Sequence, residues 1–400
     1  MNEVNLPVEL VHHIVNYLLD GRSSIWRDLS LISRRFRVVC QAILFEKLVF
    51  KRKYTRETLP GRKFLSIVQG NPRIASYVRE IRILDSDVRG LGVERMWMSM
   101  DDKFGMALGL IPRDNVRKFA LQNVSTWECL PLATRAAIAS LCSSSNLASL
   151  HIVCAPMQLL QLCGPSLEHL RLENPCVIGE ESLSALGYCK RGGQAPPLSL
   201  KTLQLSSCDS EGLFAMVSVL LDPLKVNLGG LQRLCIDVRS IDMQDRGSIN
   251  LSSFEGLRAF SFWSKPKGGG PLSEFVELLG TVPKSAPVER IHFHNTLGYV
   301  ATRHFNLGLD NNPNKGWANS FDSFVAENLS TVWKLKKVKL EFYVLWELDV
   351  RKELFPKLGD AGILELNVKR GPETICFQFS LVFQLKWGDD NYEPGSTAIL

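Results

Sequence analysis

The sequence predicts an α/β repeat protein, in which strand–helix units follow one another behind a short helical N-terminal segment. Apolar residues recur every four positions near the N-terminus, and from residue 78 onward one apolar pattern recurs ten times. Stretches with helical signals lie between several of these copies. The chain has 400 residues, 45% of them hydrophobic and 22% charged, which is enough apolar material for a sizeable core.

The first fifty residues predict two helices. In residues 5–19, Leu6, Leu10, Ile14 and Leu18 form one apolar stripe, and Pro7 suits a first helical turn. A second helix is expected from about residue 26 to residue 44. A module of this size buries little apolar surface alone, so it is expected to use a partner's surface.

This segment resembles the F-box motif. The resemblance rests on residues 6–10 (LPVEL), on the stripe that follows, and on residues 31–36 (LISRRF), while residues 44–50 (LFEKLVF) are similar to what often follows the motif in fungal members. The resemblance implies docking on the Skp1 adaptor of a cullin-RING ubiquitin ligase. By position in the motif, the adaptor contacts and the local core would come from Leu6, Pro7, Leu10, Ile14, Trp26, Ile32 and Phe36. The alternative is a helical cap that closes one end of a larger domain.

The rest of the chain carries the pattern apolar-x-x-apolar-x-apolar. Each copy ends in the period-two alternation of a β-strand, and most copies start 26 to 33 residues apart. The ten copies start at Val78, Val116, Leu147, Leu167, Leu200, Leu231, Leu257, Val288, Leu335 and Ile363. Residues 45–50 fit as an earlier, terminal copy.

Helices are expected between copies at residues 210–221 and 273–279, each with a serine at its start. One strand and one helix per unit resembles a leucine-rich-repeat solenoid, and Leu200-x-x-Leu203-x-Leu205-x-x-Cys208 is similar to that family's signature. Most other copies lack the Asn or Cys at the turn, so the predicted repeat is degenerate. An ordinary α/β domain with similar strands is the alternative. The expected domains are an F-box at 1–50, a basic linker or first repeat connection at 51–77, the repeats at 78–388 and a disordered tail at 389–400.

The net charge of +6, at an isoelectric point near 8.7, is mild for this length and does not indicate nucleic-acid binding. No uninterrupted apolar run could cross a membrane, and the N-terminus has no signal-peptide pattern. Ten scattered cysteines favour a reduced compartment, so the expected location is cytoplasmic or nuclear. Residues 51–63 carry a local excess of basic side chains, interpreted as a solvated linker face or a nuclear-targeting signal.

In such a solenoid the residues on either side of the middle apolar position point to the concave face, where partners bind. Seven of these twenty residues are Lys or Arg and two are acidic. They suggest a basic surface for an acidic or phosphorylated client, with generic solvation of the strands as the alternative. The predicted client-binding residues are Arg82, Lys118, Arg171, Arg233, Arg290, His292 and Lys339.

The common catalytic motifs are absent from the sequence, and neither a cofactor nor a metal is predicted. His292 and His294 lie on one side of a predicted strand, where two histidines could bind a metal, but without a third ligand they are interpreted as solvent-facing. Residues 308–317 are interpreted as a polar loop, either at a binding edge or as a plain surface excursion.

The predicted function is a substrate receptor of an SCF-type (Skp1–cullin–F-box) ubiquitin ligase, which binds Skp1 through the F-box and an unknown client through the repeats. Such a subunit performs no bond chemistry and acts by holding the client near the ubiquitin-loaded enzyme. The alternative is a leucine-rich-repeat interaction scaffold without ligase association, and an enzyme is a distant third.

Overall fold

In the computed structural model, the chain divides into two compact units. The described residues are 10, 34–52, 58–85, 96–124, 127–176, 198–207, 213, 216–217, 220, 226–241, 250–266, 273–297, 315–331, 333–344, 355–370 and 398–399. Unit 1 comprises residues 1–167, 176–195 and 384–400, and unit 2 comprises residues 168–175 and 196–383. Each unit is considered below by itself.

The described strands of unit 1 form parallel pairs in the order β4-β3-β2-β1-β14. Their bounds are β1 Lys47–Lys51, β2 Glu80–Leu84, β3 Lys118–Gln122, β4 Ser149–Val153 and β14 Ala398–Ile399. Equivalent positions lie side by side, since Leu48 pairs with Ile81, Ile81 with Phe119, and Phe119 with Leu150. These residues are all at most 2% exposed, so one side of the strands faces the core of the unit.

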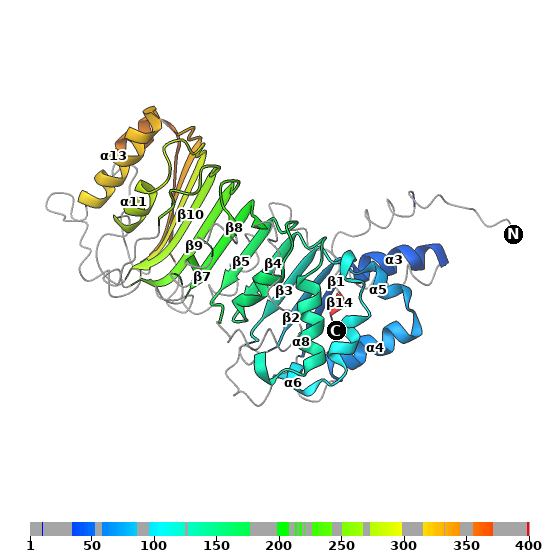
Figure 1. Cartoon of the computed structure of the whole chain (residues 1–400). Helices are drawn as coiled ribbons and strands as arrows, with labels where there is room; N and C mark the ends of the chain where they lie inside the picture. Colours follow the sequence, from blue (N-terminus) through cyan, green and yellow to red (C-terminus); the bar gives the residue numbers. More distant parts are fainter. Residues whose placement is uncertain are drawn as a thin grey trace. The chain divides into compact units, whose positions relative to one another are not determined.

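Helices cover that apolar side of unit 1 (Figure 1). They are α3 Arg34–Glu46, α4 Pro60–Gly70, α5 Arg73–Tyr77, α6 Trp97–Met100, α7 Phe104–Gly109 and α8 Leu132–Cys142, with 3-10 turns η2 Arg113–Asn115, η3 Trp127–Cys129 and η4 Met157–Leu162. The ring of Phe50 in β1 lies 5.5 Å from Phe64 in α4 and 5.2 Å from Phe104 in α7. Residues 51–77, expected to be a basic linker or first repeat connection, contain the helices α4 and α5 between β1 and β2, and the buried side chains of Phe64 and Val68 attach α4 to the core.

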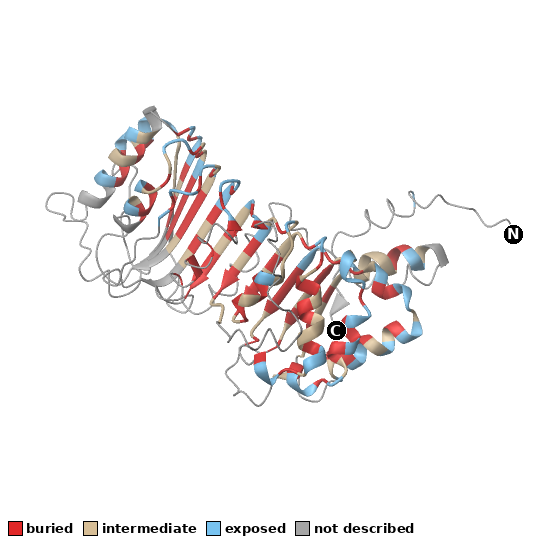
Figure 2. Ribbon diagram, in the orientation of Figure 1, coloured by how far each residue is buried: buried red, intermediate tan, exposed pale blue. Residues whose placement is uncertain are grey.

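In unit 2 the main strands are also parallel, in the order β13-β12-β11-β10-β9-β7-β5. Their bounds are β5 His169–Glu173, β7 Thr202–Ser207, β9 Arg233–Ile241, β10 Ala259–Pro266, β11 Arg290–Leu297, β12 Lys337–Val344 and β13 Leu364–Arg370. The short strands β6 Leu198–Ser199 and β8 Val226–Asn227 form a separate parallel pair. Buried residues recur along the strands in both units (Figure 2).

The predicted strands are confirmed at every copy of the pattern. A strand covers the second and third apolar residues of all ten copies, and β1 covers those of the terminal copy at residues 45–50. One register differs from the predicted alignment, because Lys339 pairs with Glu365 rather than with Asn367. Leu364, Leu366 and Val368 are apolar at alternate positions, so a shift of two residues keeps an apolar side chain on the same side.

The described helices of unit 2 are α11 Ser273–Gly280, α13 Lys315–Thr331 and α14 Pro356–Asp360. The helix predicted at residues 273–279 is confirmed as α11. Phe275 in α11 is fully buried, and its ring lies 5.5 Å from Phe260, 5.1 Å from Phe293 and 5.9 Å from Phe321 in α13. This aromatic cluster holds α11 and α13 on the apolar side of β10 and β11 (Figure 1).

Two expectations about irregular segments need correction. Residues 315–317, expected in a polar loop, begin α13, whose inner side chains Phe321 and Val325 are fully buried. Residues 398–399, expected in a disordered tail, form β14 beside β1. Residues 308–314 and 389–397, and most of the helices predicted at 5–19 and 210–221, lie outside the described residues.

Candidate functional site

Several strands in both units begin with the same backbone hydrogen-bonding pattern. Two successive amides donate to one carbonyl oxygen of the neighbouring strand, as when Gln232 and Arg233 both donate to Lys201 O at 2.9 and 3.0 Å. This two-against-one pairing has the form of a β-bulge. The other amide pairs with this arrangement are 117–118, 148–149, 201–202, 258–259, 289–290 and 336–337. None of these residues is buried, so the bulge keeps two consecutive side chains at the surface of each strand start.

Beyond the bulge, alternate residues of the strands form two further rows on the side opposite the apolar core. In unit 2 the strand register places Cys235, Ser261, His292 and Lys339 side by side in one row. Two residues farther along, the next row contains Asp237, Trp263, His294 and Glu341. Side chains of the two rows meet in a polar cluster on strands β10–β12, which consists of Trp263, His292, His294, Lys339 and Glu341.

Glu341 is the centre of this polar cluster. Its Oε2 lies 3.1 Å from Nε2 of His292 and 3.5 Å from Nδ1 of His294, and its Oε1 lies 2.8 Å from Nζ of Lys339. A carboxylate can only accept hydrogen bonds, so an ionised Glu341 requires a proton on each of these ring nitrogens. The indole of Trp263 stacks on the His294 ring, with centroids 3.9 Å apart and planes at 9°.

The carboxyl of Glu341 stays ionised although it is buried. Burial opposes ionisation, but the hydrogen bonds from His292, His294 and Lys339 outweigh it and hold the pKa of Glu341 far below its ordinary value of 4.5. His292 and His294 are 7% and 4% exposed, so the expectation that they face solvent is wrong. The cause is Glu341, whose carboxylate replaces water as the hydrogen-bonding partner of both rings.

The predicted client-binding residues divide into two groups. Arg82, Arg171 and Lys339 each bind a glutamate two residues away on the same strand, at 2.6 Å from Glu80, 3.2 Å from Glu173 and 2.8 Å from Glu341, and His292 is buried. Lys118, Arg233 and Arg290 are exposed at strand starts. Glu80 belongs to the first outward row and was counted, whereas Glu173 and Glu341 belong to a third row that the count left out, although their spacing of two residues from Arg171 and Lys339 was visible in the sequence.

Cys235, Asp85 and Asp101 lie in surroundings that fit a role in packing and hydrogen bonding within the fold. Burial raises the pKa of the Cys235 thiol to about 12, and nearby Asp237 adds to the rise, so this thiol stays protonated. Burial raises the pKa of Asp85 to about 6, against a hydrogen bond from the Met98 amide. Asp101 accepts hydrogen bonds from the amides of Gly61 and Lys103, at 2.7 and 3.2 Å, and these bonds join α4 to the segment before α7.

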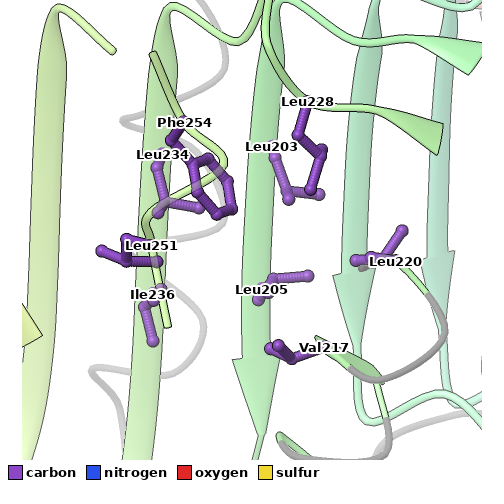
Figure 3. Close-up of a pocket in the computed structure, with 9 residues that line it drawn as sticks. All are labelled: Leu203, Leu205, Val217, Leu220, Leu228, Leu234, Ile236, Leu251 and Phe254. Carbon is purple, nitrogen blue, oxygen red and sulfur yellow. The ribbon is translucent and has the colours of Figure 1, made fainter. Parts of the chain in front are cut away.

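Unit 2 contains an apolar cavity over the core-facing side of β7 and β9 (Figure 3). Its volume is about 10 Å³, and its lining consists of Leu203, Leu205, Val217, Leu220, Leu228, Leu234, Ile236, Leu251 and Phe254. This volume is close to that of one water-sized probe, which is far below the size of a small-molecule site. The cavity is therefore a packing gap in the core.

Among the predicted adaptor-binding residues, Leu6, Pro7, Ile14, Trp26 and Ile32 lie outside the described residues. Leu10 is helical and 44% exposed, and Phe36 is half-buried in α3.

The exposed side chain of Val38 in α3 lines an open groove of about 540 Å³ between α3 and α5. Its other lining residues are Arg37, Gln41, Asn71, Pro72, Arg73 and Tyr77.

Within the described ranges, no three His, Cys, Asp or Glu residues are placed to hold a metal ion together. In the same ranges, no helix combines the length and the apolar character needed to cross a bilayer. In comparisons with known proteins, no protein-family model matches the chain, and no curated protein matches it significantly.

Proposed function

We propose that this protein is a substrate-receptor subunit of an SCF-type ubiquitin ligase, with an N-terminal F-box for Skp1 and a degenerate leucine-rich-repeat array for the client. The observation that carries the proposal is the in-register set of parallel strands, of which β3, β4, β7, β9, β10, β11 and β12 each start with two consecutive residues that are not buried. Repeated units of this kind present one extended surface, which suits a protein segment better than a small molecule.

The adaptor contact is supported by the order of motif residues in the first fifty positions and by the exposure of Leu10. A leucine that is 44% exposed has unburied apolar surface to offer a partner, and the sequence predicts that Leu10 belongs to the apolar stripe of a helix. In the proposed complex the helical stripe of Leu6, Leu10 and Ile14 packs on Skp1, and the strands hold the client. The ligase's ubiquitin-loaded enzyme performs the chemistry.

The test is co-purification of the full chain with Skp1, analysed by size-exclusion chromatography. Wild type is expected to form a one-to-one complex, and Leu10→Ala with Ile14→Ala is expected to weaken it at least tenfold, because buried leucine-sized contacts contribute about 1.5–3 kcal/mol each. The matched control is Met106→Ala with Leu132→Ala, which removes two other exposed apolar side chains and should leave binding unchanged.

Failure of the wild-type chain to bind Skp1 would exclude the receptor and favour the leucine-rich-repeat scaffold without a ligase. If the control pair weakened binding equally, the association would be due to non-specific hydrophobic contacts rather than to the motif.

A further inference from the structure

Two cysteines of unit 1 occupy equivalent places in successive copies of the apolar pattern. Cys142 is the last residue of α8 and precedes the copy that starts at Leu147, whereas Cys163 directly follows η4 and precedes the copy that starts at Leu167. Strand β4 lies between the two cysteines in the sequence. Both are thiols in the structure, and Cys142 is fully buried while Cys163 is partly exposed.

The backbone segments that follow the two cysteines run next to each other. A Cβ atom on Gly164 would lie 3.9 Å from the carbonyl oxygen of Ser144. Slightly farther along, the hydroxyl of Ser166 donates a hydrogen bond to the carbonyl oxygen of Leu147 at 3.1 Å. These contacts hold the two segments in a fixed alignment, so the cysteines at their starts lie opposite each other.

The two thiols are in direct contact. Cys163 donates its own proton to the carbonyl oxygen of Leu159, with Sγ 3.6 Å from that oxygen. Its sulfur accepts a hydrogen bond from the Cys142 thiol, and this bond, together with burial, raises the pKa of Cys142 well above its ordinary value of 9.0. Cys142 therefore stays protonated, and Cys163 is the thiol of the pair that solvent can reach.

A second pair of cysteines in unit 1 is not aligned in this way. Cys176 lies opposite Pro156 in a parallel bridge, and its amide donates to the carbonyl oxygen of Ala155 at 3.0 Å. Cys154 precedes Pro156 by two residues, an offset of about 6.6 Å along the chain, and neighbouring strands lie about 4.8 Å apart. The resulting Cα separation of about 8 Å exceeds the range of a disulfide. Cys142 and Cys163 are therefore better placed to be joined than Cys154 and Cys176.

We propose that Cys142 and Cys163 are a redox-sensitive pair, which forms a reversible disulfide when the protein meets a hydroperoxide. A disulfide holds its sulfurs about 2.05 Å apart, a distance that two thiols in hydrogen-bond contact reach by side-chain rotation. The partly exposed side chain of Cys163 has the freedom to make this rotation. Such a modification site lies beyond the proposed receptor function and does not depend on it.

The reaction consumes one hydroperoxide molecule for each disulfide. Sγ of Cys163 gives up its proton and attacks one oxygen of the O–O bond, so that this oxygen stays on sulfur as a sulfenic acid and the other leaves with the proton as water or an alcohol. Sγ of Cys142 then attacks the sulfenic sulfur, and its proton leaves with the displaced hydroxide as water. The two thiols lose two electrons, which reduce the O–O bond. A dithiol reverses the step by thiol–disulfide exchange.

The disulfide encloses the whole of strand β4. It closes a loop of about twenty residues and ties the end of α8 to the end of η4. Repeats of a solenoid contact mainly their neighbours, so a covalent bond between successive repeats restricts their separation. Oxidation is therefore expected to raise the midpoint of thermal unfolding of the chain by about 5–10 °C.

The experiment exposes the purified, fully reduced full chain to hydrogen peroxide and maps its cysteines by two-step alkylation in urea. N-ethylmaleimide first blocks every remaining thiol, dithiothreitol then reduces the disulfides, and iodoacetamide labels the cysteines released. Trypsin leaves Cys142, Cys154 and Cys163 on one peptide, residues 136–171, so fragmentation reads all three labels together. Iodoacetamide is expected on Cys142 and Cys163 of the same molecule and N-ethylmaleimide on Cys154, in chains that remain monomeric on a non-reducing gel.

Three variants separate the roles of the cysteines. Cys163→Ser should leave Cys142 blocked by N-ethylmaleimide and should remove the oxidation-dependent rise of the unfolding midpoint. Cys142→Ala should leave Cys163 as a sulfenic acid, which dimedone traps severalfold more than in wild type. Cys154→Ser is the matched control and should form the disulfide as wild type does.

Three outcomes would overturn the proposal. These are iodoacetamide on Cys154 in place of either partner, reversible oxidation of Cys163 with Cys142 still blocked by N-ethylmaleimide, and an equal midpoint rise in wild type and Cys163→Ser. The result is independent of the Skp1 experiment, because no adaptor is present. A chain that ignores Skp1 but forms the disulfide keeps the redox pair and loses the ligase, and a chain that binds Skp1 without forming it does the reverse.

Discussion

At the scale of single residues, Glu341 organises the polar side of strands β10–β12. One carboxylate accepts hydrogen bonds from two histidines of β11 and from Lys339 of its own strand. Such a buried charge is stable only while all of its partners remain, because an unpaired buried charge has lost its water without compensation. The stability of this region therefore depends on the ionisation of Glu341.

We predict that Glu341→Gln lowers the free energy of unfolding at pH 7 by about 2 kcal/mol, the scale of hydrogen bonds to a charged group. The pKa of Glu341 is lower in the folded chain than its ordinary value of 4.5. Its contribution is therefore present above that value and is lost as the pH falls below it. The difference between wild type and variant, measured by urea unfolding, should shrink between pH 5.5 and pH 3.

Glu365→Gln serves as the control, because Glu365 forms an ion pair with Lys337 at the surface and exposed pairs contribute only about 0–1 kcal/mol. A difference for Glu341→Gln that stayed constant across this pH range would show that its ionisation does not matter.

At the scale of elements, helices α4 and α7 touch backbone to backbone. A Cβ atom added to Gly61 would lie 2.5 Å from Cα of Phe104, and the Gly61 amide donates to Oδ2 of Asp101 at 2.7 Å. A side chain at this position would separate the two helices and lengthen that hydrogen bond. Gly61 is therefore a contact point between elements rather than a flexible link.

We expect Gly61→Ala to destabilise unit 1 by about 1–3 kcal/mol, the usual effect of overpacking. Gly70→Ala in the same helix is the matched control, since a Cβ atom there meets nothing within 4 Å. Thermal unfolding followed by circular dichroism should give a lower midpoint for Gly61→Ala alone. Equal midpoints for the two variants would refute close α4–α7 packing.

Helix-capping residues and apolar spacing explain why α11 was predicted from the sequence and why α4 and the start of α13 were missed. The start of α11 follows from the serine at its first position and its end from Gly280, both of which act within one turn. The basic residues 51–63 concealed α4, although Pro60 and the four-residue spacing of Phe64 and Val68 are helical signals. The start of α13 was missed because Asn, Pro and Gly around residue 315 indicate a turn, whereas burial of Phe321 favours the helix.

At the scale of the whole chain, a segment near the C-terminus pairs with the first strand. Ala398 pairs with Leu48 and Ile399 with Val49, so β14 occupies the edge of β1. An unpaired strand edge presents free amide and carbonyl groups that attract other chains. This contact links positions that are 350 residues apart in sequence.

Removing residues 397–400 should therefore promote self-association. Sedimentation velocity at equal concentration is expected to show a larger mean sedimentation coefficient for the truncated chain than for the full chain. Ile399→Val, which keeps the backbone pairing, is the control and should behave like the full chain. Identical sedimentation of the truncated and full chains would mean that β14 does not protect the edge of β1.

The sequence by itself determined where the strands lie and which of their side chains face the core, because both follow from an apolar spacing that acts within a few residues. The tertiary structure alone decided which outward residues of different strands meet. Glu341 reaches His292 from 49 residues away, and Arg233 and Arg290 both pair with Ala259, because parallel pairing aligns distant strands. The ion pairs of Arg171 and Lys339 differ, since each joins residues two apart on one strand, whereas the alignment of strands depends on long-range packing.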